Sequence, residues 1–383
     1  MFSRFQPSFL LVALSNLLQR KTRLAVALIG TGVPIVLLCL QIASLNAARV
    51  QVTRLYDDFD FDLAIVPSVY QFLVESGTFD RVRFTQARAV PGVAETFSLN
   101  VDPNNWTDEA TDRRSSMLLI GVDEDESFVR DPAIKAGLRA LTGNRSVLMD
   151  DFSSGDFGAL ATGTEGMISE QSAEIAGHFQ LGLFFYADGS AIVKNAAYPG
   201  FARRDPQEVS IGLLRVEKGA DPAVVKIRLA RTLPDDVRVM TREELIESER
   251  AFFISTKPIG IMLTISMWIA FVVGSVILWQ VISADVINRI KEFATMKAMG
   301  FSQSYVLGIG LAEAALLAIG AFLPAFAVSA LILWLIEWLT HLPTSITPAL
   351  AVTVAGIVLA MCVMSAVAAM RRIARAAPAE LYR

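Results

Sequence analysis

Four apolar segments, unevenly spaced along the chain, constrain its fold more than any other feature. A helix crosses the hydrocarbon core of a bilayer with about 20 mostly apolar residues. About 210 residues without a comparable apolar run separate the first segment from the second, which is enough for a folded domain. The four predicted transmembrane helices cover residues 24–45, 258–284, 305–336 and 347–370.

Charge is divided between these regions. Residues 45–255 carry 33 Asp and Glu against 22 Lys and Arg, a net charge of −11. The remaining residues carry +7, so the net charge of −4 conceals an acidic block inside a basic, apolar frame. The whole chain is only 19% charged, whereas soluble domains have about 25% charged residues. The composition therefore indicates a membrane protein.

Lysine and arginine near the ends of the spans predict the orientation, because cytoplasmic loops are enriched in these residues. The basic segments are 1–23, 285–304 and 371–383, and all three fall on one side of a four-span protein. We therefore expect both termini and the 285–304 loop in the cytoplasm. The domain at 46–257 and the loop at 337–346 would then lie outside, which is the periplasm if the cell has an outer membrane.

The periplasmic domain has a mixed pattern of strands and helices. The predicted fold class is thus an α-helical membrane protein with four transmembrane helices and a large α+β extracytoplasmic domain between helices 1 and 2. Asp221-Pro222 opens a helix between two apolar runs, so residues 210–240 predict a βαβ unit. The predicted strands are 62–66, 117–122, 146–149, 179–185, 191–193, 210–216 and 237–240.

A charged helix at 242–256 joins this domain to the second span. Thr241 and Glu244 have the spacing of a capping box at its start. Because the helix runs almost directly into the span, we interpret it as a stalk that couples the two. Arg250, Phe252 and Phe253 are the stalk residues assigned to that task, with an ordinary packed helix as the alternative.

The sequence contains few of the groups that most hydrolytic sites need. There are two histidines, no G-x-S-x-G and no Gly-Lys dipeptide, so neither a His-based metal cluster nor a P-loop is predicted. Both cysteines fall inside spans. The acidic run Asp57, Asp58, Asp60 and Asp62 lacks the glycine and distal glutamate of a calcium loop and is interpreted as a solvated turn. No catalytic or metal residue is therefore assigned.

The loop after the second span predicts a short amphipathic helix that ends at Gly300. Met296 and Met299 would face the cytoplasm, and methionine adapts well to a partner's groove. An interfacial helix lying on lipid headgroups is an equally good interpretation of the pattern alone.

The stretch Glu292-Phe-Ala-Thr-Met-Lys-Ala-Met-Gly-Phe301 resembles the signature that follows the second span in FtsX/MacB-type permeases of ABC transporters (type VII superfamily). More narrowly, the chain resembles DevC-type permeases over nearly its whole length. Further matching stretches are Lys21-Thr-Arg-Leu, Ala187-Asp-Gly-Ser, Thr241-Arg-Glu-Glu-Leu, Pro258-Ile-Gly and Ala377-Pro-Ala-Glu-Leu.

The resemblance implies a non-catalytic permease subunit that works as a homodimer with a separate ABC ATPase, which binds the ATP and Mg²⁺. It implies export of a glycolipid or other amphiphile through a periplasmic membrane fusion protein and a TolC-like outer-membrane channel, with no nucleic-acid partner. An FtsX-like regulator that activates a periplasmic enzyme without transport remains open. The residues that would contact the ATPase are Glu292, Phe293, Met296, Lys297, Met299, Gly300 and Phe301.

Overall fold

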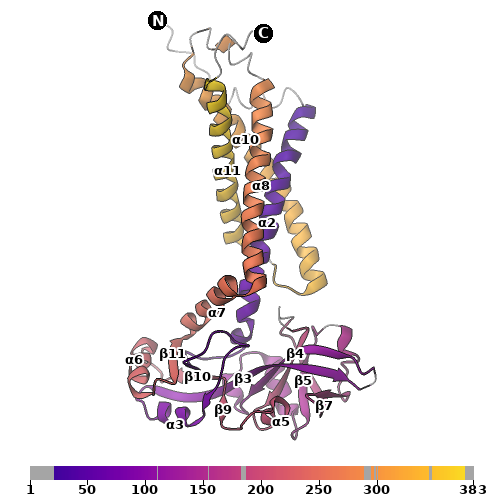
Figure 1. Cartoon of the computed structure of the whole chain (residues 1–383), viewed down its shortest axis with the longest axis vertical. Coiled ribbons are helices and arrows are strands. Elements are labelled where there is room, and N and C mark those ends of the chain that lie inside the picture. Colours follow the sequence, from indigo (N-terminus) through magenta and orange to yellow (C-terminus); the bar gives the residue numbers. More distant parts are fainter. Residues whose placement is uncertain are drawn as a thin grey trace. The chain divides into compact units, whose positions relative to one another are not determined.

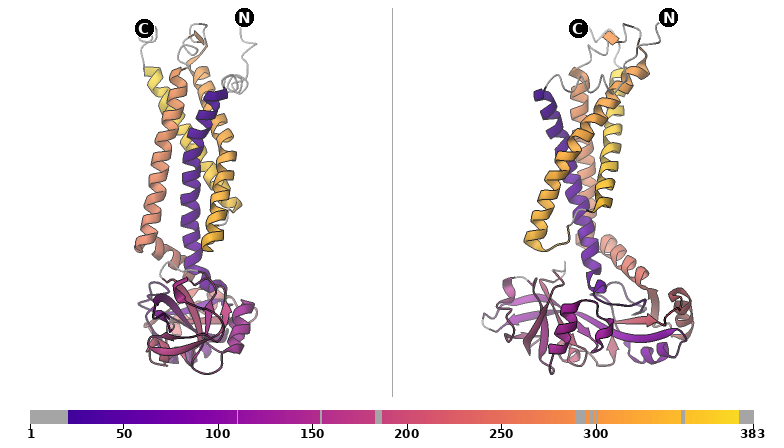
Figure 2. Two further views of the ribbon diagram at one scale, coloured as in Figure 1. Left: turned by 90° about the vertical axis from the view of Figure 1, so that its right-hand side faces the viewer. Right: turned by 180° about the vertical axis from the view of Figure 1, so that it is seen from behind.

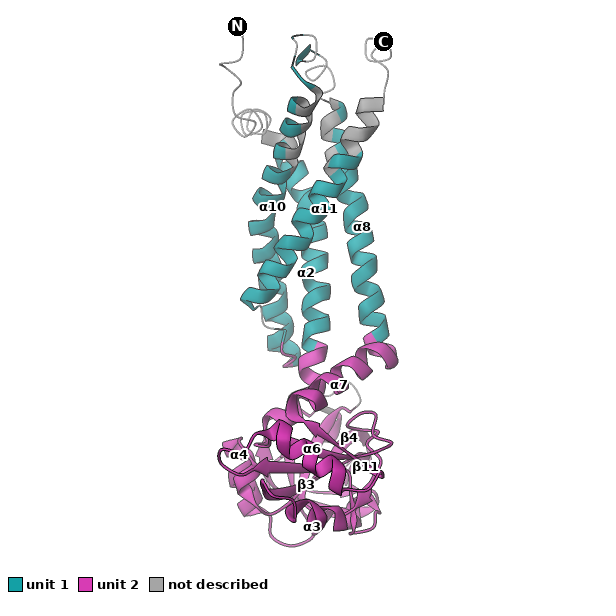
Figure 3. Ribbon diagram, turned by 90° about the vertical axis from the view of Figure 1, so that its left-hand side faces the viewer, with its two compact units in different colours: residues 1–47, 261–340, 344–383 teal, residues 48–260, 341–343 magenta. Residues whose placement is uncertain are grey.

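The protein divides into two compact units, each described here by itself (Figure 3). The helical unit comprises residues 1–47, 261–340 and 344–383, and the α/β domain comprises residues 48–260 and 341–343. The structure is a computed structural model. It describes residues 21–109, 111–153, 155–182, 187–288, 295–296, 299, 301–344 and 347–375.

Long apolar helices lie side by side in the helical unit (Figures 1 and 2). They are α2 (Lys21–Asp57), α8 (Pro258–Asn288), α10 (Gln303–Thr340) and α11 (Pro348–Arg375). In the described part of the chain, four stretches are long and apolar enough to cross a membrane: Leu24–Asp57, Pro258–Val281, Ala315–Thr340 and Pro348–Ser365. Small residues allow the helices to approach, since a β-carbon at Gly274 of α8 would lie 3.0 Å from Met361 of α11 and 3.2 Å from Pro34 of α2.

All four helices extend beyond the spans predicted from the sequence, α8 to Asn288 and α11 to Arg375. Helix α2 continues to Asp57, twelve residues past the predicted end at 45, so the α/β domain begins with helix. Helix α10 continues to Thr340 and takes up the first residues of the predicted 337–346 loop. Hydropathy does not register the extra turns of α2, because polar residues such as Gln51 and Arg54 interrupt the apolar run.

A nine-stranded sheet with the order β11-β1-β10-β3-β4-β8-β5-β7-β6 forms the centre of the α/β domain. Strand β6 pairs with β3 as well as with β7, so six strands close on themselves while β10, β1 and β11 extend the sheet from β3. The strands are β1 (Leu63–Pro67), β3 (Val93–Asp108), β4 (Arg114–Val122), β5 (Ser146–Asp150), β6 (Glu165–Ile168), β7 (Gln171–Phe179), β8 (Gly189–Lys194), β10 (Ile211–Val216) and β11 (Val237–Thr241). A separate ribbon pairs β2 (Phe79–Asp80) with β9 (Glu208–Val209).

Strand β1 shows how the extended part of the sheet is covered on both faces. Its Leu63 and Ile65 belong to a buried cluster with α3 (Val82–Arg88) and α6 (Pro222–Thr232). Its Ala64 and Val66 belong to the opposite cluster, which contains the end of α2 and helix α7 (Arg242–Thr256). All five residues of β1 are therefore buried, which explains the unbroken apolar run.

The remaining helical elements of the domain are short and cover the closed part of the sheet. They are η1 (Glu126–Phe128), α4 (Pro132–Ala140), η2 (Gly155–Phe157) and α5 (Tyr198–Ala202). Helix α4 packs on β5 and β7, with Gly137 so close to Leu148 that a β-carbon would lie 2.5 Å from its Cδ1. Trp106, Phe157 and Phe201 fill a separate core on the other side of β4, β5 and β8.

Six of the seven predicted strands are confirmed, as β1, β4, β5, β8, β10 and β11. The predicted strand at 179–185 is wrong over residues 180–182, because β7 ends at Phe179, and residues 183–185 lie outside the described residues. The longest strand, β3, was not predicted at all. The predicted βαβ unit is present in split form, since β1 lies between β10 and β11 and runs antiparallel to both.

Candidate functional site

Helix α7, the predicted stalk, begins with the predicted cap. The Thr241 hydroxyl accepts from the Glu244 N–H, and the Glu244 carboxylate accepts from the Thr241 N–H at 2.9 Å. Lys226 of α6 pairs with the same carboxylate at 2.5 Å, and this pair lowers the pKa of Glu244. The start of α7 is thus fixed to β11 and α6.

Two arginines of α7 hold it against the end of α2. Arg242 donates to the carbonyls of Tyr56 and Phe59, both at 3.0 Å, and lies 3.2 Å from the Asp57 carboxylate. These contacts satisfy carbonyls that a helix end leaves without partners. Two turns further along α7, Arg250 donates to the Arg49 carbonyl at 3.3 Å and to the Thr53 hydroxyl at 3.2 Å.

Between these arginines the Glu249 carboxyl is fully buried. It accepts from the hydroxyls of Tyr56 at the end of α2 and Tyr70 after β1, the first at 3.0 Å, and from the Leu73 N–H at 3.2 Å. Burial raises the pKa of Glu249 to about 7, although the hydrogen bonds oppose that shift. One carboxyl therefore joins α7, α2 and the segment 68–75.

Aromatic stacking continues this attachment at the end of α7. The Phe72 ring stacks on Phe252 and Phe253, with centroids 6.0 and 6.4 Å apart. Lys257 lies over the rings of Phe72 and Phe252 and also pairs with Glu75. Phe253 is fully buried. This predicted stalk residue therefore belongs to the core of the contact between α7, the end of α2 and the segment 68–75, which we call the joint.

The helix is interrupted next, because Lys257 is extended and α8 begins at Pro258. A β-carbon at residue 260 would lie 2.2 Å from the Phe253 carbonyl oxygen, so only glycine allows the first turn of α8 to lie this close to the last turn of α7. The stalk and the following helix are thus joined by a single extended residue.

Part of the predicted ATPase-coupling segment is described. Glu292, Phe293, Lys297 and Gly300 lie outside the described residues. Met299 is 64% exposed, and its N–H donates to the Thr295 carbonyl. The Phe301 N–H donates to the Met296 carbonyl at 3.1 Å, the six-to-one hydrogen bond typical of a helix ending in a Schellman motif. The contact of this segment with an ATPase stays a prediction.

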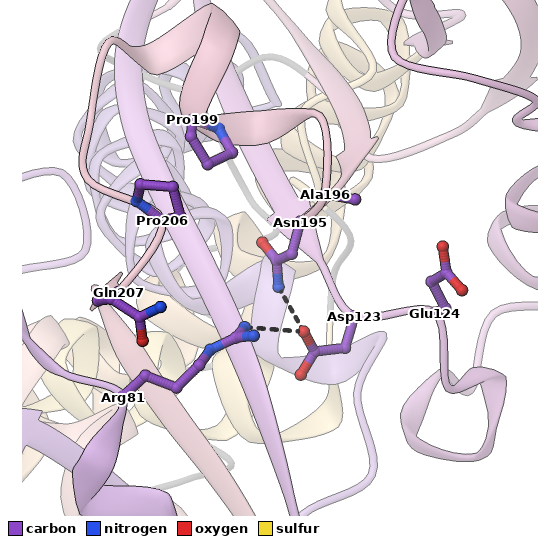
Figure 4. Close-up of a pocket in the computed structure, with 8 residues that line it drawn as sticks. All are labelled: Arg81, Asp123, Glu124, Asn195, Ala196, Pro199, Pro206 and Gln207. Carbon is purple, nitrogen blue, oxygen red and sulfur yellow. Dashed lines mark hydrogen bonds and ion pairs between the residues drawn. The ribbon is translucent and has the colours of Figure 1, made fainter.

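A polar pocket of about 410 Å³ opens on the α/β domain, lined in part by Arg81, Asp123 and Asn195 (Figure 4). Strands β4 and β8 are parallel, so Asp123 and Asn195, which follow them, lie at the same edge of the sheet. The Asp123 carboxylate accepts from the Ser98 N–H and hydroxyl at 2.6 Å, from Asn195 at 2.8 Å and from Arg81 at 3.3 Å. These donors satisfy Asp123 within the domain, so its role is to hold three strands together.

The acidic run at 57–62 is not the solvated turn that we expected. Asp58 is buried, Asp60 pairs with Arg130 at 2.5 Å, and Asp62 accepts from the Val216 N–H at 2.9 Å. The Arg130 hydrogen bond lowers the pKa of Asp60. Within the described residues, no group of His, Cys, Asp and Glu side chains is arranged to hold a metal ion.

Sequence reasoning missed Glu249, Tyr56 and Tyr70. A signal for the glutamate was present, since Leu245, Glu249 and Phe253 are spaced by four residues and form the buried face of α7. An acid in the apolar stripe of an amphipathic helix indicates a paired, buried carboxyl. The two tyrosines carried no comparable signal, because their partner is distant in sequence.

Comparison with known families gives one match. Residues 264–378 match the family described as FtsX-like permease C-terminal. The match covers most of α8 and all of α10 and α11. No curated protein matches the chain.

Several solved structures resemble part of this chain, with low sequence identities and low TM-scores. One is the extracellular domain of the noncanonic ABC-type transporter YknZ from Gram-positive bacteria, at 14% identity and a TM-score of 0.33, covering 47% of this chain and 98% of that one. Another is the periplasmic region of MacB from Actinobacillus actinomycetemcomitans, at 7% identity and a TM-score of 0.36, covering 53% and 97%. A third is a permease-protein domain from Porphyromonas gingivalis, at 12% identity and a TM-score of 0.33, covering 54% and 99%. These TM-scores are too low to describe the fold of the α/β domain, which is therefore described by its own strand order.

Proposed function

We propose, from the premise that residues 264–378 form an FtsX-like permease domain, that this chain is the non-catalytic permease subunit of an ATP-driven ABC complex. A separate ATPase would bind the ATP and Mg²⁺. The four helices that are long and apolar enough to cross a membrane support a subunit embedded in the inner membrane.

The charge distribution supports the orientation within this proposal. The basic segments 1–23, 285–304 and 371–383 favour cytoplasmic termini, and four spans would then place the α/β domain on the periplasmic side. The segment 285–304, with Met296 and Met299, would then meet the ATPase from the membrane side. An exposed methionine such as Met299 suits a groove on a partner.

The observation that supports the proposed mechanism is that α7 is attached both to the start of α8 and to the end of α2. Its last turn meets α8 through one extended residue, and Gly260 packs against the Phe253 carbonyl. Arg242, Glu249 and Arg250 attach the same helix to the end of α2. A displacement of α8 caused by the ATPase would therefore be passed to α7 and from there to the sheet that begins with β1.

The assembly around the subunit follows from the resemblance of the sequence to DevC-type permeases. We propose a permease homodimer that works with a membrane fusion protein and a TolC-like outer-membrane channel. The exported compound would be a glycolipid or another amphiphile taken from the periplasmic side. Motion of the α/β domain, and not passage between the transmembrane helices, would drive export.

Purification of the full chain from native membranes tests the proposal. We expect an ABC ATPase and a membrane fusion protein to co-purify, and ATP hydrolysis to depend on the permease. Met299→Asp should lower the permease-dependent ATPase activity about tenfold, since a charge in an apolar contact costs more than 1.4 kcal/mol. Met167→Asp, the same change at an exposed position of β6, serves as the matched control.

The proposal has clear contrary outcomes. Recovery of the chain without any ATPase would contradict the ABC assignment. Equal ATPase activity of Met299→Asp and the control would contradict the coupling segment. Co-purification of a periplasmic hydrolase in place of a fusion protein would contradict export.

A further inference from the structure

Three oxygen atoms form a closed triangle at the joint between α7 and α2. The Tyr56 hydroxyl lies 3.0 Å from Glu249 Oε1 and 2.9 Å from the Tyr70 hydroxyl, and the Tyr70 hydroxyl contacts the same Oε1. The other carboxyl oxygen, Oε2, accepts from the Leu73 N–H. Every edge of the triangle is thus at hydrogen-bonding distance.

The number of protons in the triangle depends on Glu249. Each tyrosine has a single O–H and fills one edge. The third edge becomes a hydrogen bond only when Oε1 itself carries a proton. With the carboxyl ionised, one pair of oxygens would face each other without hydrogen, in a site that water does not reach. The geometry therefore fits a neutral carboxylic acid.

The cations around the joint are engaged with other groups. Arg242 and Arg250 of α7 donate to backbone carbonyls of α2, and Arg238 of β11 donates to the Tyr70 carbonyl at 2.6 Å. Lys257 pairs with Glu75 of the segment 68–75. In the described part of the chain, no ion pair to Glu249 is found, so its negative charge would be buried with hydrogen-bond donors but without a cation partner.

We propose that Glu249 is a positioning residue for transmission and that its proton closes the joint between α7, the end of α2 and the segment 68–75. Loss of the proton loosens the joint and uncouples α7 from the sheet. Transmission through the stalk thus responds to the proton concentration on the side of the α/β domain. The role in transmission rests on the proposed function. The joint itself rests only on the hydrogen bonds described above.

The expected size of the effect follows from the ionisation of the carboxyl. Burial raises the pKa of Glu249 to about 7 in the closed joint, against an ordinary value near 4.5 when the joint is open. Between pH 6 and pH 8 the closed joint loses its proton, while the open joint is already ionised. Linkage then makes opening about tenfold more frequent at pH 8 than at pH 6.

Hydrogen–deuterium exchange of the full chain in nanodiscs tests the joint. Peptides from 48–57, 68–75 and 242–257 are compared at equal pH between the natural chain and Glu249→Gln, so that the intrinsic pH dependence of exchange cancels. We expect the natural chain to exchange about tenfold faster at pH 8, relative to Glu249→Gln, than at pH 6. Glu247→Gln, which neutralises an exposed acid on the same helix, should behave as the natural chain.

The outcomes separate the joint from the proposed function, because exchange requires neither ATPase nor substrate. A ratio that does not change with pH, or a Glu247→Gln profile that matches Glu249→Gln, overturns the proton-closed joint. In the complex, ATPase stimulation should fall between pH 6 and pH 8 more steeply for the natural chain than for Glu249→Gln. Parallel profiles of the two overturn the positioning role even when the exchange result holds.

Discussion

Gly260 packs against Phe253 so closely that a β-carbon at residue 260 would lie 2.2 Å from the Phe253 carbonyl oxygen. The contact holds the first turn of α8, at residues 258–260, against the last turn of α7. Because the obstructing atom is backbone, a rotamer change cannot relieve the overlap. Position 260 therefore requires glycine, the residue without a β-carbon.

Gly260→Ala should therefore destabilise the folded chain by about 1–3 kcal/mol, the usual cost of an overpacked site. Gly356→Ala is the matched control, because a β-carbon at that position of α11 meets nothing within 4 Å. Alanine should there stabilise the helix by about 0.5–1 kcal/mol. Apparent melting temperatures of the two variants in detergent check this, and equal values would contradict the close contact between Gly260 and Phe253.

Asp123→Asn should weaken the α/β domain although it preserves size and shape. In either orientation the new NH₂ group faces a donor that the carboxylate accepted from, such as the Ser98 N–H at 2.6 Å. An unsatisfied buried donor costs about 1–3 kcal/mol, which lowers the melting temperature by roughly 2–8 °C. Glu124→Gln, next to it but largely exposed, should change the melting temperature by less than about 2 °C.

The buried Asp58 should make stability depend on pH. Its replacement by asparagine should stabilise the domain at high pH, whereas Asp123→Asn destabilises it. Burial raises the pKa of Asp58 to about 6, and Oδ2 has no hydrogen-bond partner. An acid whose pKa is higher in the folded state loses its stabilising contribution as the pH rises from about 4 to 6. Asp58→Asn should thus be neutral at pH 4 and stabilising by about 1 kcal/mol at pH 8. Thermal unfolding at both values checks this, and equal shifts at the two pH values would contradict the assignment.

Cysteine labelling tests the orientation directly. The natural Cys39 and Cys362 are buried, so they give little background. Cysteine in place of the 72% exposed Asp156 should react with an impermeant maleimide in intact spheroplasts. Met299→Cys should react only after lysis. The reverse pattern would invert the proposed topology.

Short apolar runs predicted strands well, although such runs are ambiguous by themselves, because in this domain they are buried on both faces of the sheet. β1 is the clearest example, with clusters on both sides. β3 escaped prediction because Asn100, Asp102 and Asn104 alternate with its apolar residues. Asn100 bonds the Ser210 N–H and Asp102 the Tyr198 hydroxyl, so the polar face is satisfied by partners about a hundred residues away. A local window cannot detect such partners.

The candidate site was likewise predictable from the sequence only where its contacts are local. The capping box and the extent of α7 follow from neighbouring residues, and both are confirmed. The triangle around Glu249 depends on Tyr56 and Tyr70, which are 193 and 179 residues away from it. Only the fold brings these three groups together, and the same is true of Ser98, Asp123 and Asn195.

Strand β3 is shared by the closed and extended parts of the sheet, and this sharing affects how the chain is made. Leu99 of β3 pairs with Ile211 of β10, so one edge of this strand waits for more than a hundred further residues to be synthesised. Pairings this distant slow folding and leave a strand edge exposed in the meantime. During biogenesis this edge of β3 therefore stays open to aggregation until residue 216 has emerged, although the six strands of the closed part all lie within residues 93–194.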